Sequence, residues 1–282
     1  MDGVIVINKP KNITSNGVVQ KVRKALNIKQ VGHCGTLDPL ATGVLPILVG
    51  QGTKISKYLV EHDKTYIATI QLGVKTSTAD SEGDIIENRD VPVLDEKQIC
   101  NTLLKFKGES MQTPPMYSAI KKDGKKLYEY ARLGQSIEIE PREIFIYEIK
   151  LLKWEKELNQ IVFEVTCSKG TYIRSLCEDI AQKNGTIGFM KELIRTRVDE
   201  FIIDDSVTLE KLEAGDFNIV TIEDIFKTAH SINLEQKELS AFLNGVLINN
   251  DKLDGVYRIY NNDKFIGLGV IKNKLLKRDV IV

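Results

Sequence analysis

Residues 32–43 read GHCGTLDPLATG and gather several residue types that can do chemistry. Glycines, a proline, a histidine, a cysteine and an aspartate occur together without the apolar period of a strand or a helix. Pro39 restricts Asp38 to extended backbone, so the chain itself aims the carboxylate. Gly35 and Gly43 allow another segment or a ligand to approach closely. We therefore predict a rigid loop that presents a thiol, a metal ligand or a carboxylate.

The thiol and metal interpretations are the weaker ones. His33 and Cys34 are adjacent, and neighbours in an extended segment point to opposite sides, which favours Cys34 as a small buried side chain over a thiolate–imidazole pair. The three histidines show no ligand spacing, so no metal is expected. The GQGTK stretch at 50–54 lacks the phosphate-loop pattern. On local grounds alone, Asp38 fits a turn or helix cap as well as a catalytic carboxylate.

The composition is that of an ordinary soluble globular protein, with 42% hydrophobic and 28% charged residues in 282. We expect a cytoplasmic protein, because the N-terminus MDGVIVINKP does not resemble a signal peptide and the four cysteines form no CxxC pair. The net charge is zero, yet residues 1–60 carry eight basic residues against two acids, and residues 200–255 carry twelve acids against four lysines. The basic end could attract a polyanion, or these charges could simply be solvated helix faces.

The remaining segments indicate an α+β protein, because strands and helices mix without regular βαβ alternation. Strands are expected at 3–8, 44–49, 64–74, 136–139, 143–154, 160–167, 256–260, 265–271 and 275–282. Helices are expected after the capping residues 14–16 and at 53–61, 95–106, 125–134, 208–214, 223–226 and 235–243, and a tight turn followed by a helix at 169–185. Residues 76–89 read as a loop. A domain boundary is placed near residue 229, and the segment after it should pack on the main body because it is short.

Seven segments in order resemble a known family: NKPKNITS (8–15), VGHCGTLDPLATGVLPILVG (31–50), DKTYIATIQLG (63–73), TSTADSEGD (76–84), QTPPMYSAIKKDGKKLYEYARLG (112–134), SKGTYIRSLCEDIA (168–181) and ELIRTRVDEF (192–201). The chain resembles the bacterial TruB-type pseudouridine synthases, which isomerise uridine 55 in the T-arm of tRNA. The resemblance implies a large mixed, mainly antiparallel sheet in a catalytic domain over 1–228, with an RNA-binding insertion at about 105–135. It implies, more weakly, a small mostly-β PUA-like RNA-binding module over 229–282.

The chemistry of this family agrees with the residues. Forming pseudouridine breaks the N1–C1′ bond and joins C5 to C1′ without gain or loss of atoms or electrons, so no cofactor is expected. One well-aimed carboxylate suffices as nucleophile or base. The resemblance assigns that role to Asp38. Attack on the ribose, attack on the base and removal of a sugar proton all remain open.

The resemblance also assigns the supporting roles. Tyr66 would stack on the flipped base and assist proton transfer, and His33 would wedge the flipped nucleotides. Arg174 would hold Asp38 ionised, and it shares an extended face with Tyr172. Further contacts are implied for Tyr172 and Leu193 with the base, for Lys9 with the site or a phosphate, and for Lys121, Lys122, Lys125 and Lys126 with phosphates.

We therefore expect a monomeric enzyme that acts on tRNA without a guide RNA and also assists tRNA folding. Two other classes stay open: an RNA-binding protein without catalysis, and a carboxylate hydrolase such as a glycosidase, which needs two partnered carboxylates where the loop offers one. Position 34 departs from the family, which commonly has a small Thr-like residue there. Cys34 could therefore be an oxidisable thiol near the site.

Overall fold

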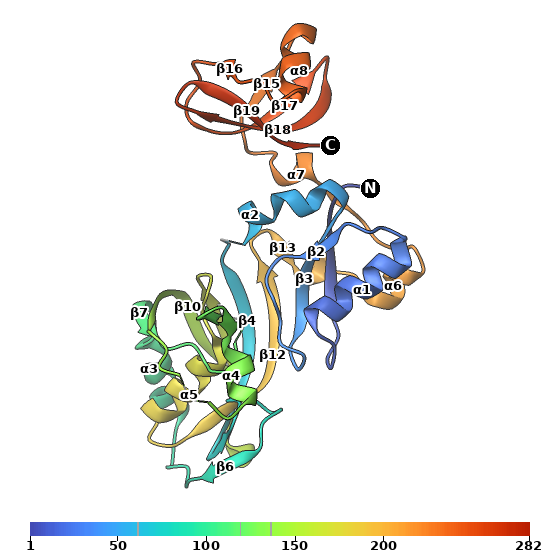
Figure 1. Cartoon of the computed structure of the whole chain (residues 1–282). Coiled ribbons are helices and arrows are strands. Elements are labelled where there is room, and N and C mark those ends of the chain that lie inside the picture. Colours follow the sequence, from blue (N-terminus) through green and yellow to red (C-terminus); the bar gives the residue numbers. More distant parts are fainter. Residues whose placement is uncertain (61, 119, 136) are drawn as a thin grey trace.

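A ten-stranded sheet forms the body of the protein (Figure 1), in a computed structural model that describes residues 1–60, 62–118, 120–135 and 137–282. Its path runs β14-β1-β3-β12-β4-β11-β10-β7, with β2 on β3 and β13 on β12. The strands are β1 (Gly3–Lys9), β2 (Val31–His33), β3 (Thr42–Val49), β4 (Lys64–Leu72), β7 (Gly108–Gln112), β10 (Arg142–Glu155), β11 (Gln160–Cys167), β12 (Gly188–Val198), β13 (Phe201–Ile202) and β14 (Val220–Thr221). Among the described strands of this sheet, β3 and β12 alone pair in parallel. The expected mixed, mainly antiparallel α+β architecture is confirmed.

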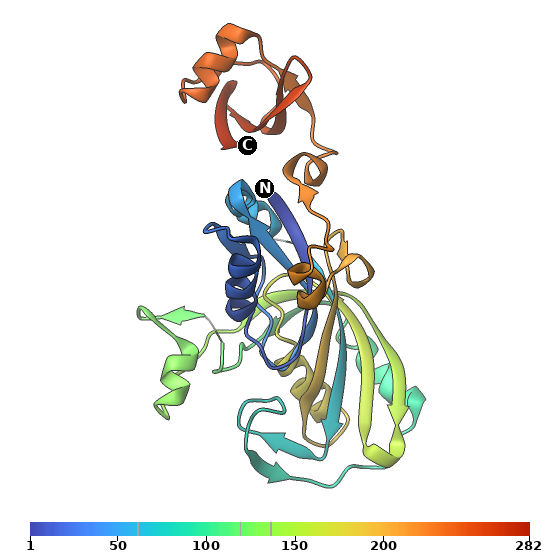
Figure 2. The ribbon, with the colours of Figure 1, turned by 90° about the vertical axis from the view of Figure 1, so that its right-hand side faces the viewer.

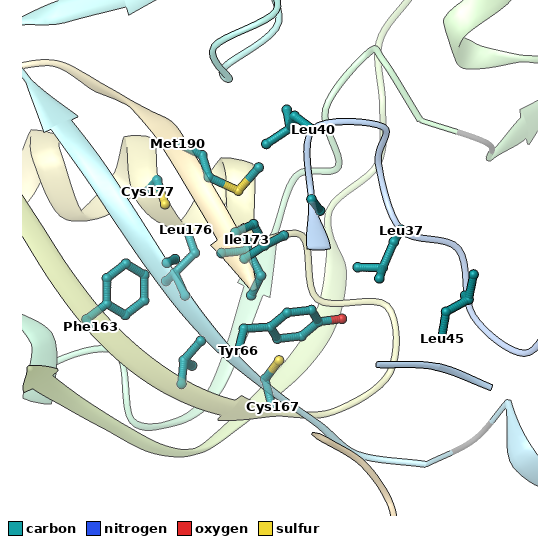
Figure 3. Packing of buried hydrophobic residues seen from close by; sticks show 14 of the residues in the cluster. Leu37, Leu40, Leu45, Tyr66, Phe163, Cys167, Ile173, Leu176, Cys177 and Met190 are labelled. Atoms are coloured by element: carbon teal, nitrogen blue, oxygen red, sulfur yellow. The ribbon is translucent and has the colours of Figure 1, made fainter. Parts of the chain in front are cut away.

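Helices pack on the sheet through narrow apolar faces. The first helix, α1 (Ser15–Leu26), begins where the Thr14 hydroxyl accepts a hydrogen bond from the backbone of Gly17 at 2.9 Å. It ends at Asn27, whose φ of 53° is the left-handed conformation that stops helices. Helices α3 (Glu96–Leu104), α5 (Ile173–Lys183) and α6 (Leu209–Glu213) follow. In α5 the buried face joins a core with β4, β11 and β12, where Phe163, Leu176 and Met190 meet (Figure 3).

A second, curled sheet lies at the carboxyl end, beyond α7 (Ile222–Ile225) (Figures 1 and 2). Its order is β15-β17-β18-β19-β16. Its elements are β15 (Ser231–Asn233), α8 (Gln236–Leu243), β16 (Ile248–Asn249), β17 (Gly255–Asn261), β18 (Lys264–Lys272) and β19 (Leu275–Ile281).

This second sheet is joined to the body through η1 (Gly50–Ile55) and α2 (Ser56–Leu59). Asp279 accepts a hydrogen bond from the Tyr58 hydroxyl at 2.6 Å and pairs with Lys57. Leu268 and Val280 share an apolar cluster with Ile55. The sheet therefore packs on the main body, as expected for a segment too short for a robust core of its own.

Two hairpins project from the body. One consists of β8 (Lys121–Lys122) and β9 (Lys125–Lys126), followed by α4 (Leu127–Arg132), and it stands away from the sheet (Figure 2). The other consists of β5 (Val74–Thr76) and β6 (Ile85–Asn88). Short 3₁₀ turns occur at η2 (Lys156–Leu158) and η3 (Ile203–Asp205). None of the described helices is long and apolar enough to cross a membrane.

The structure corrects four sequence-based expectations. Residues 76–89 are not a plain loop, because β6 and the end of β5 lie within them. Residues 137–139 form no strand, and Ser136 lies outside the described residues. The helix expected at 53–61 is a 3₁₀ turn followed by the short α2, and Glu61 lies outside the described residues. Strand β12, in the middle of the sheet, was not expected at all.

Candidate active site

A pocket of about 670 Å³ opens beside the loop that carries Asp38. The loop leaves β2 after His33 and enters β3 at Thr42, so strand pairing holds both of its ends. The other walls come from β4, from the turn before α5 and from β12. The residues that line the pocket include Gly35, Asp38, Lys64, Tyr66, Arg142, Tyr172, Arg174, Leu193 and Arg195.

Asp38 and Arg174 form an ion pair in this pocket. The distance from Arg174 Nε to Asp38 Oδ2 is 3.0 Å, and the side chains are 7% and 34% exposed respectively. The guanidinium also donates to the carbonyl of Tyr117 at 2.8 Å, which fixes its plane. A buried arginine with several acceptors holds a carboxylate in one orientation. The pairing that the resemblance implied is therefore present in the geometry.

Asp80, which was not predicted as a site residue, completes the arrangement. Its Oδ2 lies 3.6 Å from Arg174 Nη1, and the residue is 3% exposed. Its Oδ1 accepts from the Thr78 hydroxyl at 2.5 Å and from the backbone of Glu82 at 3.0 Å. Arg174 thus lies between two carboxylates, of which Asp38 is the more exposed.

These neighbours set the protonation of Asp38. Burial raises the pKa of its carboxyl above the ordinary value, and Arg174 opposes that rise. The negative charge of Asp80 raises the pKa further, and Lys9 lowers it. The carboxylate therefore combines incomplete solvation with a fixed direction, which are the properties of a nucleophile or base.

Lys9 holds the backbone of the loop that carries Asp38. It has no exposed surface, and its ammonium donates to the carbonyls of Pro10, Ile13 and Pro39 at 2.9, 2.7 and 3.1 Å. Pro39 directly follows Asp38, so this lysine fixes the backbone that carries the carboxylate. The alternative in which Lys9 reaches an RNA phosphate does not fit this placement, because all three of its N–H donors already have acceptors.

Tyr66 lies on β4 with its ring among Leu37, Cys167 and Ile173 (Figure 3). The residue is 7% exposed and lines the pocket. Burial raises the pKa of its hydroxyl to about 12, although the charge of Arg195 and a hydrogen bond with that guanidinium lower it. At neutral pH the hydroxyl is protonated.

Arg195 is a second site residue that was not predicted from the sequence, although it lies in the segment ELIRTRVDEF (192–201) that resembles the family. It is fully buried in β12, and its guanidinium donates to three carbonyls, those of Val44 at 2.8 Å, Gly35 at 3.1 Å and Thr36 at 3.4 Å. It therefore ties the loop to the sheet through carbonyls other than those that Lys9 contacts.

Gly43 permits this attachment, since its φ of 101° and its space both exclude a side chain. A Cβ there would lie 2.9 Å from the backbone nitrogen of Arg195, and closer still to its carbonyl oxygen. The close approach expected at Gly43 is thus made by β12 of the same chain.

Tyr172 and Leu193 both reach the pocket. Tyr172 precedes α5, and its backbone N–H and carbonyl bond the two ends of the Gln112 amide at 2.8 and 3.0 Å. Leu193 pairs with Ala68 across β12 and β4 and is 7% exposed. The structure therefore brings Asp38, Tyr66, Tyr172, Arg174 and Leu193 to one pocket.

His33 and the hairpin lysines lie apart from this group. His33 ends β2, is absent from the pocket lining, and has a buried Nδ1 without a hydrogen-bond partner in the described part of the chain. Burial lowers the pKa of its imidazole, and Arg195 adds to that effect.

The four lysines Lys121, Lys122, Lys125 and Lys126 lie on the β8–β9 hairpin. The Lys122 ammonium donates to the carbonyl of Glu138 at 2.5 Å. Lys125 and Lys126 lie over the rings of Tyr130 and Tyr128, at 5.8 and 5.4 Å from the ring centres.

Cys34 is 1% exposed and packs with Val44, Leu48 and Val198. Burial raises the pKa of its thiol. The expectation of a small buried side chain is confirmed, and the idea of an oxidisable thiol at the site is wrong, because an enclosed, protonated thiol does not react readily.

Comparison with solved structures shows that other proteins share this fold. The chain aligns over 99% of its length with a chain of a Cbf5-Nop10-Gar1 complex, at a TM-score of 0.68, 24% identity and 83% coverage of that chain. It aligns equally well with a chain of an H/ACA RNP bound to a substrate RNA containing 2′-deoxyuridine, at a TM-score of 0.69, 22% identity and 85% coverage of that chain.

Comparison of sequences gives the family. Residues 23–173 match the TruB family pseudouridylate synthase N-terminal domain. Residues 174–245 match the tRNA pseudouridylate synthase B C-terminal domain, and residues 231–277 match the C-terminal domain of pseudouridine synthase II TruB.

Proteins called tRNA pseudouridine synthase B are similar over nearly the whole chain. The one from Francisella philomiragia is 41% identical over 100% of this chain and 97% of its own length. That from Caldanaerobacter subterraneus is 41% identical over 98% of both, and that from Hydrogenovibrio crunogenus is 43% identical over 95% of this chain and 89% of its own. The chain belongs to the TruB family of pseudouridylate synthases, and it is an isomerase of bacterial type.

Proposed function

We propose that this protein isomerises uridine 55 in the T-loop of tRNA to pseudouridine, acting in the cytoplasm and without a guide RNA. The observation that carries the proposal is the pair of Asp38 and Arg174 in a pocket whose lining includes Tyr66, Tyr172 and Leu193. The substrate is supported by full-length relatives called tRNA pseudouridine synthase B. Four separate parts of the fold supply those side chains, namely the loop between β2 and β3, β4, the start of α5 and β12, as a site that surrounds one nucleobase requires.

The proposed reaction balances without an added reactant. The N1–C1′ bond breaks, the uracil turns, C5 bonds to C1′, and the proton leaves C5 while N1 gains one. Asp38 acts as the nucleophile or base, and Arg174 keeps its carboxylate oriented and ionised. The Tyr66 ring lies against the uracil, and its hydroxyl, whose pKa burial raises to about 12, is protonated at neutral pH and is therefore placed as a proton donor.

Access to the pocket requires base flipping in this proposal. A uridine inside a folded T-loop is stacked, and the carboxylate of Asp38 lies in a pocket, so the nucleotide must leave its stack to reach it. His33, at the start of the loop, occupies the place from which the uridine leaves. The lysines of the β8–β9 hairpin contact phosphates of the stem and set position more than sequence.

The test uses an unmodified tRNA transcript tritiated at uracil C5. Wild-type protein should release tritium to solvent, and Asp38→Asn should release none while it still binds the transcript. Release that persists in Asp38→Asn would remove this residue from the reaction. A T-arm stem-loop should be a substrate, and a transcript with uridine 55 replaced by cytidine should not.

Binding without release by the wild-type protein would instead favour an RNA-binding protein without catalysis. We also propose that the enzyme assists tRNA folding, because the projecting basic hairpin can contact RNA independently of the pocket. Asp38→Asn should then still speed refolding of a denatured tRNA, and Lys125→Gln together with Lys126→Gln should slow it.

A further inference from the structure

Two cations on the pocket wall, Arg195 and Lys64, form no ion pair with any carboxylate of the described residues. Arg195 is fully buried, and within the described residues its guanidinium bonds three carbonyls and the Tyr66 hydroxyl. Lys64, the first residue of β4, is half-buried, and its ammonium donates to the carbonyl of His62 at 2.5 Å. Across the described ranges of the chain, neither cation has a carboxylate oxygen within 4.0 Å.

The two cations are close to each other and to the loop. A Cβ on Gly35 would lie 3.5 Å from Arg195 Nη1 and 3.6 Å from Lys64 Cε. Burial lowers the pKa of Lys64, and the nearby charge of Arg195 lowers it further. Asp63 opposes these effects on Lys64 only weakly and forms no ion pair with it, so within the described structure the wall beside Gly35 carries positive charge in a poorly solvated place, which is costly unless an anion binds there.

The two cations that hold Asp38 and its loop, Arg174 and Lys9, are compensated or closed. Arg174 lies between the carboxylates of Asp38 and Asp80. Lys9 has no exposed surface, and backbone carbonyls occupy its ammonium. Lys64 differs because it lines the pocket, is partly accessible, and has one acceptor for three N–H donors in the described structure.

We infer that Lys64 binds a phosphodiester group next to the flipped uridine, while Arg195 adds positive charge behind it and positions Gly35. The inference rests on the proposed function, since a nucleotide that enters the pocket brings a phosphate on each side. A lysine contacts a phosphate as a point charge and needs no fixed plane. Arg195 cannot touch the phosphate itself, because it has no exposed surface.

The experiment neutralises each partner separately. The substrate is a T-arm stem-loop, in which the phosphodiester on the 5′ or the 3′ side of the target uridine is replaced by an uncharged methylphosphonate. The enzyme variant is Lys64→Gln, which keeps an N–H donor for the carbonyl of His62 but removes the charge. Dissociation constants and single-turnover tritium release are measured for all combinations.

Lys64→Gln should weaken binding of the natural stem-loop by about tenfold, the effect of one charge-assisted hydrogen bond, and it should reduce the salt dependence by about one phosphate contact. At one of the two linkages, the methylphosphonate should cost the wild-type protein about the same factor and Lys64→Gln nothing more. Lys64→Arg should keep most of the affinity. The exposed Lys97 on α3 provides the control, and Lys97→Gln should bind both substrates as the wild type does.

The inference would be overturned if, at both linkages, Lys64→Gln and the methylphosphonate each caused their full loss of affinity when combined. It would also be overturned by wild-type protein that binds the two methylphosphonate substrates as tightly as the natural one, a result that needs no variant to fold. A wild-type protein that binds the stem-loop but releases no tritium would refute the proposed function separately, because the binding cycle would still report on Lys64.

Discussion

Arg174 contacts Asp38 and Asp80 with different atoms of one guanidinium, through Nε at 3.0 Å and through Nη1 at 3.6 Å. The two carboxylates act in opposite directions on the site. Arg174 lowers the pKa of Asp38, and Asp80 raises it. Replacement of either neighbour should therefore move the acidic limb of the pH–rate profile, and the two shifts should have opposite signs.

Arg174→Gln should shift that limb to higher pH by about one unit or more, because an adjacent cation lowers a carboxyl pKa by about 1–3 units. Asp38 must be ionised to react, so activity disappears as pH falls through its pKa. Single-turnover tritium release between pH 4 and pH 8 measures the shift. Arg142→Gln is the control, because Arg142 lines the pocket without a contact to Asp38 in the described structure. A limb at the wild-type position in Arg174→Gln would contradict the argument.

Asp80→Asn should shift the same limb to lower pH, since removal of a negative neighbour lowers the pKa of Asp38. The asparagine oxygen can still accept from Thr78 and Glu82, so the loop should keep its shape. The maximal rate should fall by about tenfold, because Arg174 loses one charged contact. The same profile measures both effects, and a shift to higher pH would show that Asp80 acts through structure and not through charge.

Tyr66→Phe should separate the ring from the hydroxyl. The ring keeps its packing, while the hydroxyl loses its bond to Arg195, so kcat should fall by about tenfold with little change in KM. Because the pKa of Tyr66 is about 12, the wild-type profile should show no limb from this residue below about pH 10. Activity in the wild type that rises with pH between 7 and 9 and is flat in Tyr66→Phe would assign the tyrosine a different role.

Gly43→Ala should destabilise the protein far more than a glycine change in open space. The added Cβ would collide with the backbone of Arg195, so the free energy of unfolding in urea should fall by more than about 3 kcal/mol. Gly215→Ala is the matched control, with a φ of 79° but no atom within 4 Å, and should cost about 1 kcal/mol. Equal losses would mean that conformational strain, and not the close approach of β12, decides the effect.

The cysteines should react in order of exposure. Cys100 on α3 is partly exposed, whereas Cys34, Cys167 and Cys177 are buried. Burial also raises the pKa values of those three thiols, which lowers the reactive thiolate fraction. Iodoacetamide followed by peptide mass analysis should label Cys100 first, and unfolding in urea should equalise the four rates. Early labelling of Cys34 in the native protein would restore it as a reactive thiol.

Local sequence predicted most elements because their signals were local. The Thr14 cap, the apolar stripe of α1 and the alternation along β4 determine those elements whatever lies around them. Strand β12 has no such signal, since charged residues interrupt it and its register shifts at Met190/Glu192 and Arg195/Arg197. Its central place depends on partners that are distant in the sequence, β3 and β4.

The residues of the site also differ in whether local sequence or distant partners determine their position. Pro39 beside Asp38 and the family resemblance together drew attention to the carboxylate. Neither Asp80 nor Arg195 was predicted as a site residue, because an acid in a polar turn and a basic residue in a segment rich in other charged residues are usually exposed. Both are buried here, because each contacts a partner on another element. Asp80 pairs with Arg174, and Arg195 donates to carbonyls of the 35–44 segment.

The parallel pairing of Gly43 with Arg195 also orders events during translation. The carboxylate of Asp38 emerges from the ribosome early, but Arg174 and then β12 are synthesised much later. Until β12 is made and pairs with β3, the bonds from Arg195 to the loop are missing, and until α5 is made Asp38 lacks its counterion Arg174. A nascent chain therefore carries the reactive group before its site is complete, and the ability to modify RNA arises only after these later elements have packed against the loop.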